Sequence, residues 1–277
     1  MPHKTRDLPI GVFDSGVGGL TVLSALRERL PRESLVYLGD TARLPYGTKS
    51  AAAVSQYAVQ ATRALVATGI KALVVADNTS SAHALETLRG EFPGLPVIGV
   101  VEPGAAAAGH ASAGGRICVI ATESTVQAGT YQRAILHSRP GAQVVSVACP
   151  LFVSMVEEGM VDGPIAERIA RHYLGALFID PPAGQRCDCL LLGATHFPAL
   201  HPLLRRLLGP EVAIVDSATT TASAVEDLLA HRRLAAASPA GTVRYMATDA
   251  PDRFARVAQV FVPWHLTADQ VELIDIG

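Results

Sequence analysis

Short apolar runs alternate with stretches of helical periodicity along almost the whole chain, and several of these runs end in small polar residues. Ala72 to Ala76 leads into Asp77 to Ser80, and Leu190 to Leu192 leads into Gly193 to Pro198. Strands separated by helices pair in parallel, and helices cover both faces of such a sheet. Because the carboxyl ends of parallel strands lie along one edge, we expect these two polar segments to be equivalent strand ends that face one pocket.

The apolar runs form two series of similar size. The first comprises Ile10 to Phe13, Leu35 to Leu38, Ala72 to Ala76 and Val97 to Val100. The second comprises Arg116 to Ala121, Val144 to Val147, Leu190 to Gly193 and Ala213 to Val215. The repetition predicts an α/β fold with two pseudo-symmetric parallel-sheet domains and an active site in the cleft between them. We expect residues 1–100 and about 217–277 to form the first domain, and residues about 101–216 to form the second.

Composition argues against several classes of function. The chain has 277 residues, a net charge of −2 and no run of like charges, so nothing favours nucleic-acid binding. It lacks the apolar core of a signal peptide and the roughly 18 consecutive apolar residues of a membrane span, so we expect a cytoplasmic protein without membrane contact. The four cysteines lack the paired spacing of a zinc site, so no metal is expected.

The loop from Asp14 to Thr21 joins the first apolar run to a helix and is rich in glycine. Glycine lets backbone amides approach a ligand, and the helix start favours an anion such as a carboxylate or phosphate. Thr21 stands where a dinucleotide-binding motif needs its third glycine, and no P-loop motif occurs. A pyridoxal phosphate enzyme needs a Schiff-base lysine, and Lys4, Lys49 and Lys71 lie outside the cleft motifs. Dinucleotide, P-loop and pyridoxal phosphate chemistry are therefore disfavoured.

Several motifs, in this order along the chain, resemble those of glutamate racemase. They are Gly11 to Val22, Pro45 to Gly47, Asn78-Thr79, Val97 to Gly104, Thr122 to Tyr131, Cys149 to Glu157 and Leu192 to Pro198. The resemblance spans essentially the whole chain. It implies a glutamate site in the cleft, no cofactor, supply of D-glutamate for peptidoglycan synthesis, and homodimers in many members.

The resemblance also implies roles for individual residues. The groups that bind the carboxylates and ammonium of glutamate would be Asp14, Ser15, Pro45, Tyr46, Gly47, Asn78, Thr79, Thr122 or Thr125, Thr195 and His196. The acidic and imidazole groups that assist catalysis would be Asp14, Glu157 and His196. The chemistry agrees, because hydroxyls, amides and backbone N–H groups suit carboxylates, and a carboxylate suits an ammonium.

The catalytic pair is where this chain departs from the family. The resemblance places cysteines at positions 77 and 194, where this chain has Asp77 and Ala194. In the family one thiol removes the α-proton and the other returns a proton to the opposite face. Alanine has no transferable proton, and an aspartate of ordinary pKa, about 3.9, is a far weaker base than a thiolate. We expect a severely impaired racemase that binds glutamate less tightly, because Asp77 adds an anion beside a substrate with two carboxylates.

Two interpretations of these positions stay open. One is deliberate substitution of an ordinary glutamate racemase. The other is a natural paralogue that binds an acidic amino acid, or that carries out one-sided proton transfer or another reaction with Asp77. A malonate-type decarboxylase of the superfamily is disfavoured, because its single cysteine lies in the second motif, where this chain has Ala194.

Overall fold

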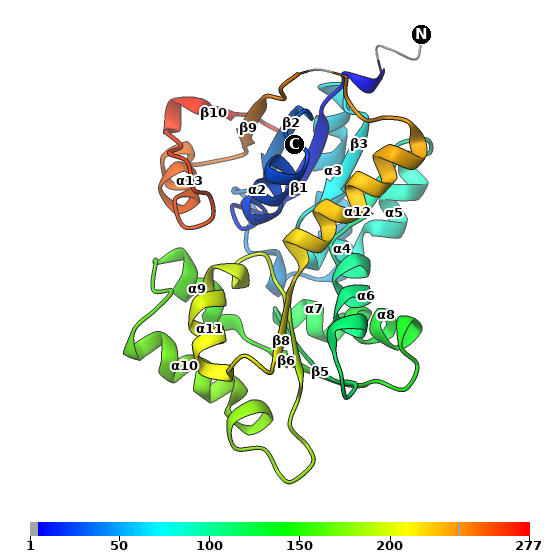
Figure 1. The fold of residues 1–277 in the computed structure, drawn as a ribbon. Helices are drawn as coiled ribbons and strands as arrows, with labels where there is room; N and C mark the ends of the chain where they lie inside the picture. Colours follow the sequence, from blue (N-terminus) through cyan, green and yellow to red (C-terminus); the bar gives the residue numbers. More distant parts are fainter. Residues whose placement is uncertain (1–4, 238) are drawn as a thin grey trace.

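The computed structural model describes residues 5–237 and 239–277, and in this part of the chain the strands form one six-stranded and one four-stranded sheet. The first sheet has the order β10-β9-β2-β1-β3-β4. Its strands are β1 (Ile10–Asp14), β2 (Leu35–Gly39), β3 (Ala72–Val75), β4 (Val97–Gly99), β9 (Val243–Ala247) and β10 (Val271–Leu273). All of its strand pairs are parallel. Figure 1 shows this sheet in the upper half of the molecule.

The second sheet repeats the central strand order of the first, β6-β5-β7-β8 against β2-β1-β3-β4. Its strands, again paired in parallel, are β5 (Arg116–Ala121), β6 (Gln143–Ala148), β7 (Cys189–Gly193) and β8 (Ala213–Asp216). The expected fold of two parallel-sheet α/β units is therefore confirmed. In this order β3 corresponds to β7, so the polar segments that follow these two strands occupy equivalent positions.

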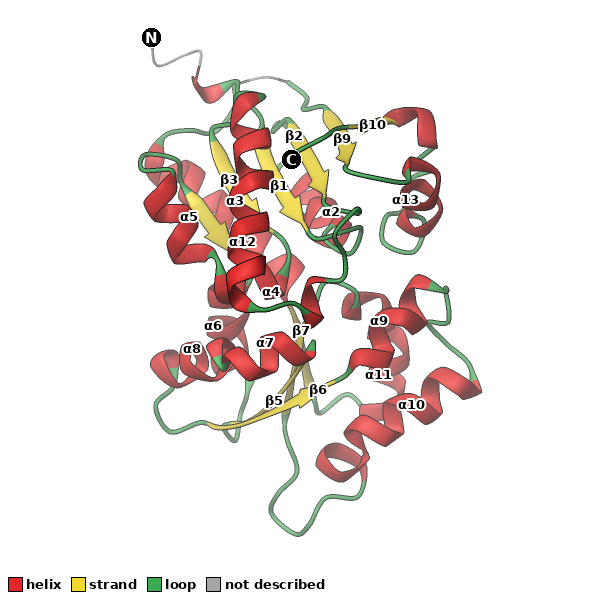
Figure 2. Cartoon of the chain, turned by 180° about the vertical axis from the view of Figure 1, so that it is seen from behind, coloured by secondary structure: helices red, strands yellow, loops and turns green. Residues whose placement is uncertain are grey.

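Helices connect the strands and cover the sheets (Figure 2). Those that follow strands of the first sheet are α2 (Leu20–Arg29), α3 (Ala51–Ala67), α4 (Asn78–His83), α5 (Leu85–Glu91), α6 (Val101–Ala111) and α13 (Pro251–Ala258). Those that follow strands of the second are α7 (Glu123–Ala128), α8 (Thr130–Ser138), α9 (Pro150–Glu157), α10 (Pro164–Leu174), α11 (His201–Leu208) and α12 (Ser217–Arg232). Short helical turns are η1 (Tyr46–Thr48), η2 (Gly175–Ile179), η3 (Phe197–Leu200) and η4 (Ala268–Gln270).

Helix α12 carries the chain from the second sheet back to the first, as Figure 1 shows. Asp216 begins it by accepting a hydrogen bond of 2.9 Å from Thr219 N, the arrangement that makes aspartate a favourable N-cap. The chain then pairs β9 with β2, with Val243 opposite Leu35, and adds β10 at the edge. Strand β10 was not expected from the sequence; it has three residues, of which Glu272 and Leu273 are exposed. The domain boundaries near residues 100 and 216 stay a prediction.

One hydrophobic core joins the two halves. It includes Ile10 of β1, Leu23 of α2, Leu190 of β7 and Val225 of α12, all buried. Packing of α12 against α2 links the two halves on the side where the chain returns. Within residues 5–237 and 239–277 there is no helix with the length and hydropathy required to span a bilayer.

Candidate active site

A cavity of about 230 Å³ lies between the two sheets, and its walls come from both. Loops that follow β1, β2 and β3 form one side, and segments that follow β5, β6 and β7 form the other. The predicted site residues that line it are Ser15, Pro45, Tyr46, Gly47, Asp77, Asn78, Thr79, Thr122, Glu157, Ala194, Thr195 and His196. The polar strand ends therefore do meet at one pocket, and Asp77 and Ala194 face it from equivalent strands.

Asp14 and Thr125 lie behind this lining. The Asp14 side chain is buried, and its Oδ2 accepts a hydrogen bond of 2.8 Å from Gly16 N. Thr125 Oγ1 lies 3.2 Å from Thr79 Oγ1 and 3.0 Å from Thr122 Oγ1, so it supports two hydroxyls that do line the cavity. Both residues belong to the site as supports of its wall.

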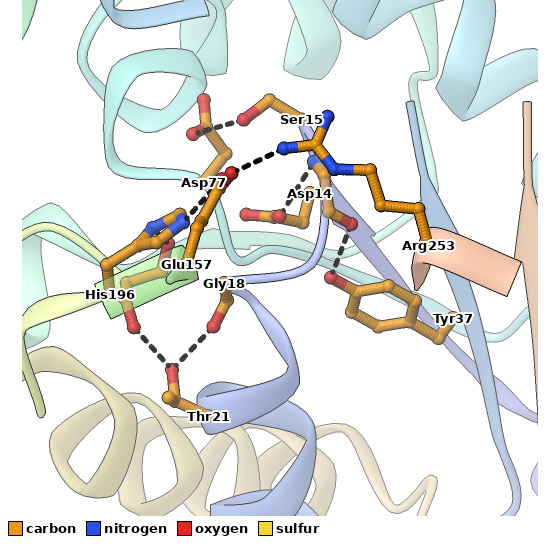
Figure 3. A network of polar contacts seen from close by, with 11 residues as sticks. Asp14, Ser15, Gly18, Thr21, Tyr37, Asp77, Glu157, His196 and Arg253 are labelled. Carbon is orange, nitrogen blue, oxygen red and sulfur yellow. Dashed lines mark hydrogen bonds and ion pairs between the residues drawn. The ribbon is translucent and has the colours of Figure 1, made fainter. Parts of the chain in front are cut away.

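Asp77 follows β3 and begins α4. Its Oδ2 accepts a hydrogen bond of 2.6 Å from Ser80 N. Its Oδ1 accepts one of 3.0 Å from the Ser15 hydroxyl, which Figure 3 shows. The first bond is a typical aspartate N-cap, which explains why the sequence can turn into a helix at this point. Burial raises the pKa of the Asp77 carboxyl, and the bonds from Ser80 and Ser15 partly oppose that rise.

Asp14 is the second acidic group of this region. Burial, and then the charge of Asp77, raise the pKa of Asp14 to about 6. Its Oδ1 is buried and has no hydrogen-bond partner within the described residues. The Tyr37 hydroxyl donates a 3.0 Å hydrogen bond to Gly16 O and so holds the loop that carries Asp14 (Figure 3). The carboxyl groups of Asp14 and Asp77 are thus both buried, and the charge of Asp77 makes Asp14 harder to ionise.

Ala194 forms the opposite wall directly after β7, and Thr195 and His196 follow it. The glycine-rich loop packs against this segment, because a Cβ atom on Gly18 would come within 2.6 Å of His196 Nδ1. The Thr21 hydroxyl also donates a hydrogen bond of 3.2 Å to Thr195 O (Figure 3). The glycine loop thus supports the wall that carries Ala194, in addition to lining the cavity itself.

His196 belongs to a chain of polar contacts that crosses the cleft (Figure 3). Its Nε2 lies 3.2 Å from Glu157 Oε1, and Arg253 Nη2 donates a hydrogen bond of 2.9 Å to Glu157 Oε2. The hydrogen bond with His196 lowers the pKa of Glu157, and Arg253 adds to this effect. Arg253 was not predicted from the sequence, because it lies on α13, far along the chain from Glu157, in a segment without a recognisable motif.

Hydroxyl and amide groups cover the wall beside Asp77. Thr79 Oγ1 lies 3.2 Å from Thr122 Oγ1, which brings α4 and the start of α7 together. Asn78 Nδ2 donates a hydrogen bond of 2.6 Å to the Tyr131 hydroxyl, and its buried Oδ1 has no partner within the described residues. The sequence analysis did not identify Tyr131 as a support for Asn78.

The loop with Tyr46 approaches the cavity from the first sheet. The Tyr46 hydroxyl donates to Asp40, which also accepts a hydrogen bond of 2.7 Å from Arg43 Nε, so this hydroxyl is engaged away from a ligand. Gly47 packs against Thr122, because a Cβ atom there would lie 2.9 Å from Thr122 Cβ. The cavity is also lined by residues that were not predicted as site residues, namely Gly16, Val17, Leu44, Thr48, Glu123, Pro150, Val153 and Ser154.

The composition of the lining limits the chemistry of the site. Among the described residues it includes the carboxyl groups of Asp77, Glu123 and Glu157 and the imidazole of His196, but no lysine or arginine. The part of the chain that the structure describes holds no group of three or more histidine, cysteine, aspartate or glutamate side chains suited to a metal ion. The site can therefore hydrogen-bond a small polar molecule and move a proton at Asp77 or His196, whereas Ala194 offers only a methyl group.

The chain is similar to known racemases over its whole length. Residues 11–225 match the family model described as Asp/Glu/Hydantoin racemase. The chain is 41% identical over 274 residues to the glutamate racemase of Chlorobaculum tepidum, with 98% of each chain covered. It is 45% identical over 263 residues to that of Geobacter metallireducens, covering 95% of this chain and 94% of the relative. The structure of glutamate racemase from Francisella tularensis in complex with D-glutamate matches with a TM-score of 0.89 and 33% identity, covering 98% of each chain.

Proposed function

Since the chain belongs to the Asp/Glu/hydantoin racemase family, we propose that its cleft binds glutamate and interconverts the two enantiomers only poorly. The observation that carries this proposal is the pairing of Asp77 and Ala194, which line one cavity from equivalent strand ends. In an unimpaired member of the family, the same reaction would supply D-glutamate for peptidoglycan. The changed pair in this chain would leave binding in place and remove half of the proton transfer.

Binding of glutamate is supported by the groups that remain around the cavity. The hydroxyls of Thr79 and Thr122 and the backbone of the glycine loop can donate to carboxylates. The unpaired Oδ1 of Asn78 is an acceptor that an ammonium group would satisfy. The cavity of about 230 Å³ suits a ligand of amino-acid size.

Racemisation needs a proton to leave one face of the α-carbon and another to arrive on the opposite face. Asp77 can accept a proton on its side, and its raised pKa makes it a stronger base than an ordinary aspartate. Ala194 cannot return one on the other side. Loss of one general acid or base lowers a rate by roughly 10²–10⁴-fold, so we expect at least that loss here.

A second candidate is a natural paralogue that exchanges the α-proton without inversion. The hydrogen bonds from Ser15 and Ser80 to Asp77 favour it, because they hold one carboxylate in place at the wall. Such a protein would exchange the α-hydrogen of glutamate for deuterium in D₂O and keep its configuration.

The test compares four proteins: the chain as it is, Asp77→Cys, Ala194→Cys and the double variant. Each is incubated with L-glutamate in D₂O, and D-glutamate and α-deuteration are measured. We expect the double variant to form D-glutamate at least 10²-fold faster than the original chain. An inactive double variant that still binds glutamate would refute the racemase function. If the original chain formed D-glutamate as fast as the double variant, the reaction would not need two thiols.

A further inference from the structure

Asp77 already occupies two hydrogen-bond donors of its wall. Its two oxygens take the Ser15 hydroxyl at 3.0 Å and Ser80 N at 2.6 Å. A ligand carboxylate that approached this wall would need the same kind of donors, because an ionised carboxylate accepts hydrogen bonds and donates none. The Asp77 carboxylate therefore competes with a carboxylate of a dicarboxylic ligand for this wall.

The charges around the cavity add to this effect. Glu157 forms an ion pair with Arg253 and a hydrogen bond with His196, but Asp77 forms no ion pair among the residues that the structure describes. Glu123, at the exposed start of α7, accepts a hydrogen bond of 3.2 Å from Gln127 and likewise forms no ion pair among the described residues. In the part of the chain that the structure describes, no lysine or arginine lines the cavity, so the wall carries an excess of negative charge.

This charge acts on a ligand at short range. In a cavity of about 230 Å³, no carboxylate of a bound amino acid can lie far from Asp77. Salt screens mainly those charges that are farther apart than the Debye length, about 8 Å at physiological ionic strength. It therefore weakens the repulsion inside the cavity only a little. The low exposure of Asp77, 7%, also reduces the screening by water.

We propose that this site prefers an α-amino acid with an uncharged carboxamide side chain, such as glutamine, over glutamate. The inference rests on the proposed amino-acid site and names its substrate class. A carboxamide has nearly the shape of a carboxylate, carries no charge, and presents an NH₂ group that can donate to the Asp77 carboxylate. Its oxygen can still accept from hydroxyls such as those of Thr79 and Thr122.

The test is isothermal titration calorimetry with both enantiomers of glutamine and of glutamate at pH 8, where Asp14, with its pKa near 6, is ionised. We expect glutamine to bind at least about 10-fold more tightly than glutamate, the order expected for one added unit charge at partly screened short range. Asp77→Asn keeps the size of the side chain and its ability to accept from Ser80 N. In that variant we expect the preference for glutamine to fall about 10-fold, mainly through tighter glutamate binding.

Asp227→Asn is the matched control, because it removes one carboxylate from the exposed face of α12, away from the cavity lining. It should leave the ratio of the two affinities unchanged. Tighter binding of glutamate than of glutamine to the original chain, or an unaltered ratio in Asp77→Asn, would overturn the inference and leave the amino-acid site standing. If neither amino acid binds to the original chain or to the double cysteine variant, the proposed function itself fails. Should Asp77→Asn not fold, the ratio measured on the original chain still decides the inference.

Discussion

Gly18 lies so close to His196 that a Cβ atom on Gly18 would come within 2.6 Å of the imidazole Nδ1, and closer still to Thr195 Oγ1. The two residues belong to loops that follow β1 of the first sheet and β7 of the second. Their contact therefore joins the two halves of the molecule directly beside the cavity. Only glycine allows this approach, which gives a physical reason for the glycine-rich loop that is independent of ligand binding.

Gly18→Ala should push the wall of Thr195 and His196 away from the first sheet. We expect a loss of about 1–3 kcal/mol in the free energy of unfolding, typical of overpacking, together with weaker amino-acid binding. Gly90→Ala is the control, because a Cβ atom there meets nothing within 4 Å and the residue lies in helix α5. Urea denaturation and calorimetric titration measure both effects. Equal stabilities of Gly18→Ala and the original chain would contradict the close contact.

Asp14→Asn should change how stability depends on pH. Burial and Asp77 raise the pKa of Asp14 to about 6, so the native state binds this proton more tightly than the unfolded chain, where the pKa is about 3.9. The contribution of Asp14 therefore favours the native state at low pH and is lost as the pH rises from about 4 to about 6. At about 1.4 kcal/mol for each pKa unit, the whole effect is about 3 kcal/mol, and about 2 kcal/mol of this loss should fall between pH 4.5 and pH 7.5.

The measurement is the free energy of unfolding at pH 4.5 and pH 7.5 for both proteins. The asparagine oxygen can still accept from Gly16 N, so the loop geometry is kept. A difference between the proteins that does not vary with pH would show that Asp14 titrates normally. Asp252→Asn, at the exposed start of α13, serves as a control for the removal of one carboxyl group.

Arg253→Ala should raise the pKa of Glu157 toward its ordinary value. The hydrogen bond with His196 is the main cause of the present lowering, so we expect a partial rise. Because Arg253 is half exposed, stability should change by less than about 1 kcal/mol. NMR titration of the Glu157 side chain measures the pKa. The control is Arg171→Ala, which breaks the exposed pair with Glu167 and should leave the pKa of Glu157 unchanged. If the pKa of Glu157 were also unchanged in Arg253→Ala, the ion pair between Arg253 and Glu157 would not form in solution.

Lys71→Met should be strongly destabilising. Lys71 is fully buried, pairs with Glu33, and donates to Leu234 O at 2.9 Å, so it ties the connection between α12 and β9 to the first sheet. Removing one partner of a buried pair leaves an uncompensated charge and costs about 3–5 kcal/mol. The double variant Lys71→Met/Glu33→Leu should recover part of this loss. Denaturation curves of the original chain, of Lys71→Met and of the double variant measure these stabilities. A double variant less stable than Lys71→Met would argue against a charge effect.

Much of the site was predictable because it follows strand ends. Asp77 and Ala194 were predicted as site positions because they directly follow the apolar runs of β3 and β7. Short buried strands that end in small polar residues can be recognised from the local sequence. Arg253 and Tyr131 had no such signature. Arg253 meets Glu157 from a distant part of the chain, and Tyr131 supports Asn78 from a helix of the second half, so neither partner can be inferred from neighbours in sequence.

The sequence by itself determined the two parallel sheets, the equivalence of the segments after β3 and β7, and the absence of thiols at positions 77 and 194. Hydrophobic periodicity and turn residues act locally, so they can be found without knowledge of the fold. Only the tertiary structure decided that Asp77 is an N-cap bonded to Ser15, that Asp14 is buried beside it, and that Arg253 compensates Glu157. Burial and charge pairing depend on which distant segments pack together, and they set the pKa of each carboxyl group and the charge that a ligand meets.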